Sequence, residues 1–415
     1  MANNILTISK ITNEALMVLE NELTFTAGVD REYNDQFLDG EAKIGDTINI
    51  RRPGRFIGVE GPALGVEDFN ETSTPLVLST QFHVDTQFTT KTLKLSLGDF
   101  TKRVIKPAIA TIANKIDRDG LIMATNATGN IVGTPGTPPS ALTTYLDAQA
   151  YLDSEGAPRD GERSAIISQW MGPPIVNALS GLFMPAHQIS EQYTKGLMGR
   201  DSGGMNWKQD VNVQSHTFGS WAGTAGTLTV NGANQGLSTG WARTSTINIT
   251  STEIGTLNVG DCITFAGVYG VNPQSRQSYG KLRNFVVTSA VALTNGNTSV
   301  TVSPALIYGG QFQNVSATPA TGATITPFNM ASTTAGAVTS PQGLVFHKSA
   351  FTMAMVDLPL PDGVAFAGRQ SDKEAGISLR IVRQYTINND SLPARVEVLY
   401  GWASLYTELA CRVAA

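Results

Sequence analysis

Apolar side chains recur at three- and four-residue spacing near the start of the chain, from Ile8 to Leu23. This spacing places them on one face, so it predicts an amphipathic helix that packs against a partner. The residues that follow, to about Gly45, carry mixed charges with too little periodicity to form a core. We therefore predict that residues 1–45 form an N-terminal arm.

Two segments of strand-forming residues follow, at 47–51 and 76–84, and they are able to pair. The residues between them, 52–74, are rich in Gly and Pro and far exceed the length of an ordinary hairpin connection. We interpret them as an extended loop. Basic residues come first and acidic residues later, which suits contacts with a neighbouring subunit. A solvated loop explains the charges equally well, because exposed ion pairs contribute little. The charged candidates are Arg52, Arg55, Glu60, Glu67, Asp68 and Glu71.

Helical spacing returns over residues 99–126, where one face is marked by isoleucines and Pro107 either opens or kinks the helix. A further helix is predicted from Ser140 to Leu152, a strand at 163–168 and a helix at 175–182. This half therefore mixes helices and strands. Short alternating strands at 344–351, 379–382 and 395–402 are predicted to return to the same body.

Between Val211 and Ser340 the pattern changes to short alternating runs separated by turn residues. Only six charged residues occur there, while Gly, Thr, Ser, Asn and Val dominate. Such a pattern is typical of a small β-barrel or sandwich. The simplest organisation is an α+β domain interrupted by an all-β insertion.

The low share of charged residues indicates that much of the surface is covered by something other than water. Charged residues make up 15% of the 415, below the roughly 25% usual for soluble domains. The net charge of -5 and the absence of like-charge blocks exclude a dedicated nucleic-acid binder. Cys262 and Cys411 fit a reducing compartment and are expected to be small buried residues. No signal peptide or membrane span is evident, so cytoplasmic assembly is expected.

The sequence carries no signature of catalysis. It lacks nucleotide-binding, zinc-protease and nucleophile-elbow motifs. The four histidines, His83, His187, His216 and His347, fall on different predicted elements, so we assign them structural roles. No catalytic residue, cofactor or metal is predicted. An unrecognised hydrolase would need a clustered site with shifted pKa values, which the sequence does not reveal.

The order of elements resembles the Hong Kong 97-type major capsid fold of tailed bacteriophages. Asn258–Val268, NVGDCITFAGV, resembles a strand in the inserted domain of coat proteins from short-tailed phages. Gly343–Phe351, GLVFHKSAF, resembles a segment that often follows it, and Leu399–Trp402 resembles the last strand of the family. The resemblance implies an α+β fold with an N-arm, an extended loop, a spine helix, peripheral and axial domains and an inserted telokin-like β-barrel.

The resemblance also implies the role of each part. Residues 1–45 would be the arm, 46–221 the first part of the capsid core, 222–331 the insertion domain and 332–415 the second part of the core. The loop at about 52–74 would lie over a neighbour, and the helix at about 99–126 would be the spine. The insertion would project outward, aid folding and contact neighbouring capsomers.

Partners follow from the same resemblance. In relatives the arm receives a basic segment of a scaffolding protein, and Glu14, Glu20 and Glu22 are the candidate docking residues here, with a solvated helix face as the alternative. Contacts between capsomers in relatives use a charged loop, but residues 231–244 offer only Arg243. Polar or apolar contact is therefore expected there. The extended loop contains no lysine, so covalent cross-linking through it is not supported.

We therefore predict a major capsid protein that self-assembles into pentamers and hexamers of an icosahedral head, first a procapsid and then a mature capsid. It would work with scaffolding and portal proteins and enclose double-stranded DNA without reading its sequence. Assembly is expected in the host bacterial cytoplasm. Two alternatives stay open: an encapsulin-like compartment shell, and a phage tail or surface adhesin with an Ig-like module.

Overall fold

The computed structural model describes residues 15–17, 19, 23–33, 47–62, 64–89, 106–179, 203–220, 227–238, 240–328, 337–372 and 376–415. Two compact units are present. The first contains residues 1–50, 74–120 and 351–403, and the second contains residues 51–73, 121–350 and 404–415. The candidate docking residues Glu14, Glu20 and Glu22 lie outside the described residues. The domain boundaries at 45, 221 and 331 stay predictions.

In the first unit, an antiparallel sheet has the order β17-β20-β19-β18, and β3 pairs with β20. The strands are β3 (Thr80–Thr89), β17 (Phe351–Met355), β18 (Phe366–Asp372), β19 (Ile377–Arg383) and β20 (Ser391–Ser404). Alternate residues of β19 and β20, such as Ile381 and Val396, face each other and are buried. The predicted strands at 379–382 and 395–402 both lie in this sheet.

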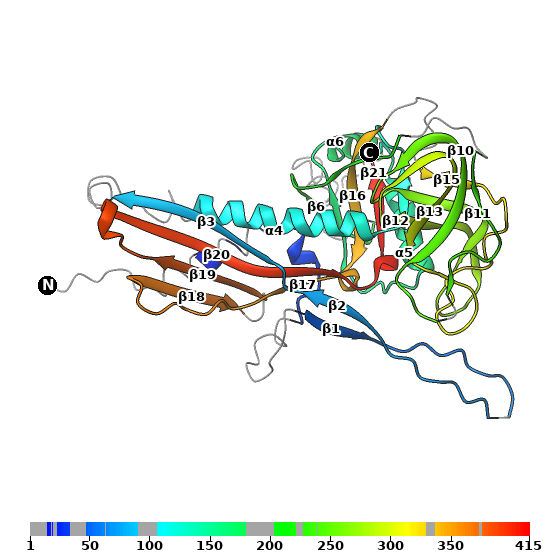
Figure 1. Ribbon diagram of the computed structural model, residues 1–415, viewed down its shortest axis with the longest axis horizontal. Helices are drawn as coiled ribbons and strands as arrows, with labels where there is room; N and C mark the ends of the chain where they lie inside the picture. The colour runs from blue at the N-terminus through cyan, green and yellow to red at the C-terminus, as the bar shows by residue number, and fades with distance from the viewer. Residues whose placement is uncertain are drawn as a thin grey trace. The chain divides into compact units, whose positions relative to one another are not determined.

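The predicted long helix is α4 (Lys106–Ala127), and it runs beside β3 and β20 (Figure 1). Ile109, Ile112 and Ile116 are buried at helical spacing, as the sequence pattern predicts. Pro107 stands in the first described turn of the helix. Residues 99–105 of the prediction lie outside the described residues.

The predicted strand at 76–84 is wrong as a single element. β1 (Thr47–Arg52) pairs with β2 (Thr72–Val77), whereas β3 begins at Thr80 and pairs with β20 instead. The break follows from close packing, because the Gly401 backbone of β20 lies against the Val77 carbonyl. The loop between β1 and β2 therefore covers residues 53–71, slightly less than predicted.

The core of the second unit is a mixed sheet covered by helices. Its order is β4-β21-β16-β5-β6, with β7 added to the start of β16. The strands are β4 (Ile131–Gly133), β5 (Arg163–Ile167), β6 (Asn206–Gln209), β7 (Ser215–Thr217), β16 (Thr339–His347) and β21 (Ala410–Ala414). Helices α5 (Leu142–Ser154) and α6 (Gly172–Leu179) contribute Tyr145, Leu152 and Ile175 to the core shared with Ile167 and Val345.

Between β7 and β16 the chain forms the predicted all-β insertion, a barrel with the strand order β15-β11-β12-β13-β10-β8 (Figure 1). A bridge between Thr229 and Thr324 joins its outer strands. The strands are β8 (Leu228–Val230), β10 (Ser245–Leu257), β11 (Cys262–Val271), β12 (Ser278–Val287), β13 (Val291–Ser303) and β15 (Ile325–Pro327). Alternate residues such as Ile247, Phe265 and Phe285 fill the interior.

Smaller elements complete the described chain. β9 (Leu237–Ser238) and β14 (Leu306–Ile307) form a short parallel pair, and single 3₁₀ turns lie at Thr26–Gly28, Lys348–Ala350, Ile387–Asn389 and Thr407–Leu409. Residues 15–17 and 19 are helical, with Ala15, Leu16 and Leu19 buried, in agreement with the predicted amphipathic pattern. In the described part of the chain, no helix combines the length and the apolar character needed to span a bilayer.

Candidate functional site

The loop between β1 and β2 leaves large apolar side chains uncovered. Their exposed fractions run from 50% at Ile57 to 90% at Leu64. The set consists of Phe56, Ile57, Val59, Leu64, Val66 and Phe69. Exposed apolar patches of this kind mark protein–protein contacts, because water solvates them poorly. The loop is therefore a candidate assembly surface.

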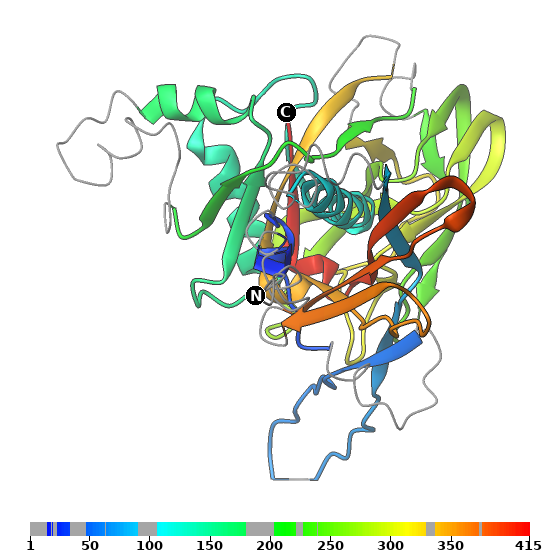
Figure 2. The same ribbon diagram turned by 90° about the vertical axis from the view of Figure 1, so that its left-hand side faces the viewer.

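Hydrogen bonds define the path of this loop, which leaves β1 and returns to β2 (Figure 2). The Glu67 carboxylate accepts the backbone N–H groups of Ile57 and Gly58 at 2.7 and 2.8 Å, which joins the outgoing and returning segments. The Arg276 guanidinium donates to the Phe56 carbonyl at 3.1 Å. The Gln311 amide donates to the Asp68 carbonyl at 2.6 Å.

The residues that contact the loop from outside it, Arg276 and Gln311, both belong to the inserted barrel region of the same chain. Arg276 lies in the turn between β11 and β12, and Gln311 follows β14. Of the acidic loop candidates, Glu67 is used within the loop, and Glu71 lies 3.5 Å from Arg51 in an exposed ion pair. Glu60 is exposed. The acidic residues therefore have different surroundings, which their spacing in the sequence did not indicate.

At the base of the loop, two loop candidates and one candidate from the insertion come together. Arg52 and Arg55 lie 3.7 and 3.6 Å from the Glu408 carboxylate. Arg243 donates to the Ser404 hydroxyl at 3.2 Å. We call Arg52, Arg55, Arg243 and Glu408 the arginine cluster. Sequence reasoning missed Glu408, because no local spacing links it to residues more than 350 positions away.

The arginine cluster combines burial with aromatic contacts. The Arg52 guanidinium lies over the Tyr406 ring at 4.3 Å and near the Trp241 ring at 5.5 Å, and it donates to the Leu405 carbonyl. Partial burial and the nearby charge of Arg52 lower the pKa of Arg243. The stacked guanidinium has a fixed orientation, which suits recognition of a planar carboxylate.

Buried polar contacts fasten the barrel to the mixed core of the second unit. Arg283 of β12 pairs with Glu155 at the end of α5, and both side chains are 3% exposed. Burial opposes the charged guanidinium, yet Glu155 raises the pKa of Arg283 above its ordinary value. The Tyr279 hydroxyl donates to the same carboxylate at 3.1 Å, and the Asn272 amide donates to the Ser154 carbonyl at 2.7 Å.

A second set of contacts lies where the chain enters the barrel. The Asp261 carboxylate pairs with His216 of β7 at 2.8 Å and accepts the backbone N–H groups of Gly219 and Asn258. Arg412 of β21 donates to the Gly260 carbonyl at 2.8 Å and contacts the Cys262 sulfur. Burial raises the pKa of Cys262, and both cysteines are free and buried, as predicted.

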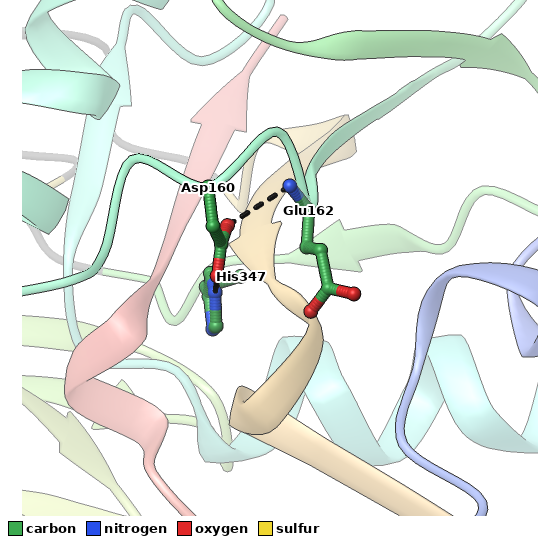
Figure 3. Close-up of side chains that lie close together, drawn as sticks. All are labelled: Asp160, Glu162 and His347. Carbon is green, nitrogen blue, oxygen red and sulfur yellow. Dashed lines mark hydrogen bonds and ion pairs between the residues drawn. The ribbon is translucent and has the colours of Figure 1, made fainter.

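Asp160, Glu162 and His347 form the one group of carboxylates and histidine in the described residues that lies close enough to bind a metal (Figure 3). The His347 Nδ1 atom faces the backbone N–H of Ser349 at 3.3 Å, so it accepts a hydrogen bond. The proton therefore resides on Nε2, which donates to Asp160 at 3.1 Å. Through this hydrogen bond His347 connects β16 to the loop before β5.

His83 and His216 likewise pair with aspartates, at 3.1 Å to Asp85 and 2.8 Å to Asp261. His187 lies outside the described residues. These pairings fit the structural roles predicted for the histidines.

A chain with an exposed apolar loop and a mixed core carrying an inserted barrel is built to be covered by other protein, as the subunits of a phage shell are. A family model described as P22 coat protein, gene protein 5, matches residues 1–411, and the chain belongs to this family. It is therefore a major capsid protein that forms the phage head, with the α+β phage capsid fold, and its location is the virion capsid. The resemblance to phage coat proteins that the sequence indicates is confirmed.

Solved structures similar to the chain come from several phages. A structure from Mycobacterium phage Che8 shares 11% identity over 94% of this chain and 90% of its own, with a TM-score of 0.47. The capsid of Ralstonia phage GP4 shares 8% identity over 94% and 88%, with a TM-score of 0.46. The CUS-3 coat protein I-domain shares 29% identity over 26% of this chain and 99% of its own, with a TM-score of 0.20. No curated protein sequence matches the chain.

Proposed function

We propose that the chain acts purely as a shell subunit, without catalysis, and that the loop at residues 53–71 covers a neighbouring subunit. The observation that carries this proposal is the row of exposed apolar side chains on a loop whose path is fixed by Glu67, Arg276 and Gln311. In water such a surface is unfavourable, so contact with another copy removes it from solvent.

The pairing of the charged groups in one pocket of the described residues supports the absence of catalysis. A hollow of about 380 Å³ over β19 and β20 is lined by Asp85, Arg380, Arg395 and Glu397 among others. Arg395 pairs with Asp85 at 2.9 Å and Arg380 with Glu397 at 2.6 Å. Catalysis by an acid or a base requires a side chain free to exchange a proton with substrate. These four side chains neutralise each other instead.

Scaffolding and portal proteins are the further partners that we propose, and assembly would take place in the host bacterial cytoplasm. The acidic residues Glu14, Glu20 and Glu22 support a basic scaffold segment by charge alone. The proposed parts are the arm at 1–45, the core at 46–221 and 332–415, and the insertion at 222–331. Double-stranded DNA would be enclosed without sequence recognition, because the chain has no clustered basic segment.

The test replaces two loop side chains that are almost fully exposed. Leu64→Asp and Val66→Asp, at 90% and 81% exposure, should leave folding unchanged and abolish closed shells in electron microscopy. Ile387→Asp is the matched control, because Ile387 is 82% exposed but lies outside the loop. Shells at parental yield from the double loop variant would refute the proposed contact.

A further inference from the structure

The arginine cluster holds more positive than negative charge. The guanidinium groups of Arg52 and Arg55 share the single carboxylate of Glu408, and the Arg243 guanidinium lies close enough to interact with the charge of Arg52. Glu155 is the next carboxylate that interacts with Arg55, but Arg283 and Tyr279 occupy it. Two positive charges of the cluster therefore have no counter-charge among the described residues.

The excess charge is accessible and only partly hydrated. The Arg243 residue is exposed, and the Arg55 side chain is 32% exposed. The Arg52 side chain is 13% exposed and is flanked by Trp241 and Tyr406. Guanidinium groups in such surroundings are screened less by water and salt than fully solvated ones, so an added carboxylate is bound more strongly there than at an open surface.

We propose that the arginine cluster binds a carboxylate of a second copy of this chain. The proposal rests on the shell function described above and names the contact that this surface makes. A second copy is the favoured partner because the chain has 34 acidic and 29 basic residues and presents acidic side chains on its own loop. Glu60 is the first candidate, since it is exposed on the same loop as the uncovered apolar side chains, which suit the aromatic rings beside Arg52.

Carbodiimide cross-linking of shells formed by the Arg243→Lys variant tests the proposal. The reagent activates a carboxyl group, the introduced amine attacks it, an amide bond forms, and the oxygen leaves with the reagent as a urea. We expect cross-linked dimers in shells, with position 243 joined to an acidic residue of another chain, and none in unassembled subunits. The parental chain is the control, because its arginine at position 243 does not react.

Mass spectrometry distinguishes the outcomes. A cross-link from position 243 to Glu408 of the same chain, present in free subunits and shells alike, would overturn the proposal. Absence of any cross-link at position 243 in shells would do the same. If the parental chain itself forms no shells, the shell function fails, which is a separate result.

A second variant tests the contact without the carbodiimide, so its result does not depend on whether the reagent reaches position 243. Arg243→Glu reverses one exposed charge and should lower shell yield by about tenfold or more, the effect of losing roughly 1.4 kcal/mol at one repeated contact. The melting temperature of the free subunit should stay at the parental value. Parental shell yield from this variant would also overturn the proposal.

Discussion

The hydroxyl of Thr26 donates to the Asp117 carboxylate at 2.7 Å, although 91 positions separate the two residues. The backbone N–H groups of Thr24, Phe25 and Thr26 donate to the same carboxylate at 2.6 to 3.1 Å. Asp117 is 2% exposed and belongs to α4. One buried side chain of the long helix thus fixes the backbone of residues 24–26.

We predict that Asp117→Ala destabilises this junction by roughly 2–4 kcal/mol, because several buried donors lose their acceptor together. Hydrogen exchange at residues 24–26 should accelerate in the variant, and the melting temperature of the free subunit should fall. Thr26→Val is the milder comparison, since it removes one donor and leaves the three backbone N–H groups paired. Unchanged exchange at residues 24–26 would contradict the prediction.

The Glu155–Arg283 pair gives the second prediction. Glu155→Ala should cost about 3–5 kcal/mol, because it leaves a buried guanidinium without its partner. The variant should accumulate as insoluble protein or melt well below the parent, as measured by solubility and calorimetry. Glu253→Ala, at an exposed position of the barrel, is the control and should behave like the parent. Equal melting temperatures for the two variants would count against the pair.

Gly401 gives a steric prediction. A Cβ atom there would lie 2.1 Å from the Val77 carbonyl oxygen, a separation that requires β20 to move away from the end of β2. Gly401→Ala should therefore destabilise the first unit by about 1–3 kcal/mol, visible as a lower melting temperature. Gly240→Ala has no atom within 4 Å of its Cβ and should leave the melting temperature unchanged. A stable Gly401→Ala variant would show that the strand moves easily.

Asp153 gives a pH prediction. Partial burial opposes its charged form, but Arg159 and Arg163 outweigh this and hold the pKa of the carboxyl below its ordinary value of 3.8. A carboxyl with a depressed folded pKa adds stability above its unfolded pKa and loses it as the pH falls through the folded pKa. Asp153→Asn should therefore melt lower than the parent at about pH 7 and approach it as the pH falls through the depressed pKa of this carboxyl, below 3.8. Thermal scans of free subunits check this, and a difference independent of pH would be the negative result.

The sequence predicted those parts of the fold that depend on local periodicity. Isoleucines at helical spacing located α4, and alternating runs poor in charge located the barrel strands. The break between β2 and β3 was missed, because Leu76 to Val84 reads as one strand. The break arises from Gly401 packing against Val77, a contact between residues more than 300 positions apart that no local pattern records.

The candidate site also combines features that local sequence predicts with contacts between distant residues that it does not predict. Arg52 and Arg55 were found through the length and polarity of their loop, and Arg243 because the family resemblance implied a charged loop at residues 231–244, where it is the only charged residue. The pairing of Arg52 and Arg55 with Glu408, and the contact of Arg243 with Ser404, were not predicted, since they depend on how the loop, the barrel and the segment around Glu408 pack together. Likewise, nothing in the spacing of Asp117 distinguished it from the solvated aspartates of a helix.

The attachment of the loop to its own barrel through Arg276 and Gln311 affects the thermodynamics of shell closure. A segment whose backbone is already restricted in the free subunit loses less conformational entropy when a neighbour covers it. A smaller favourable interaction energy is then enough for each contact to form. Weak individual contacts dissociate readily, so a wrongly placed subunit can leave and be replaced before the shell closes.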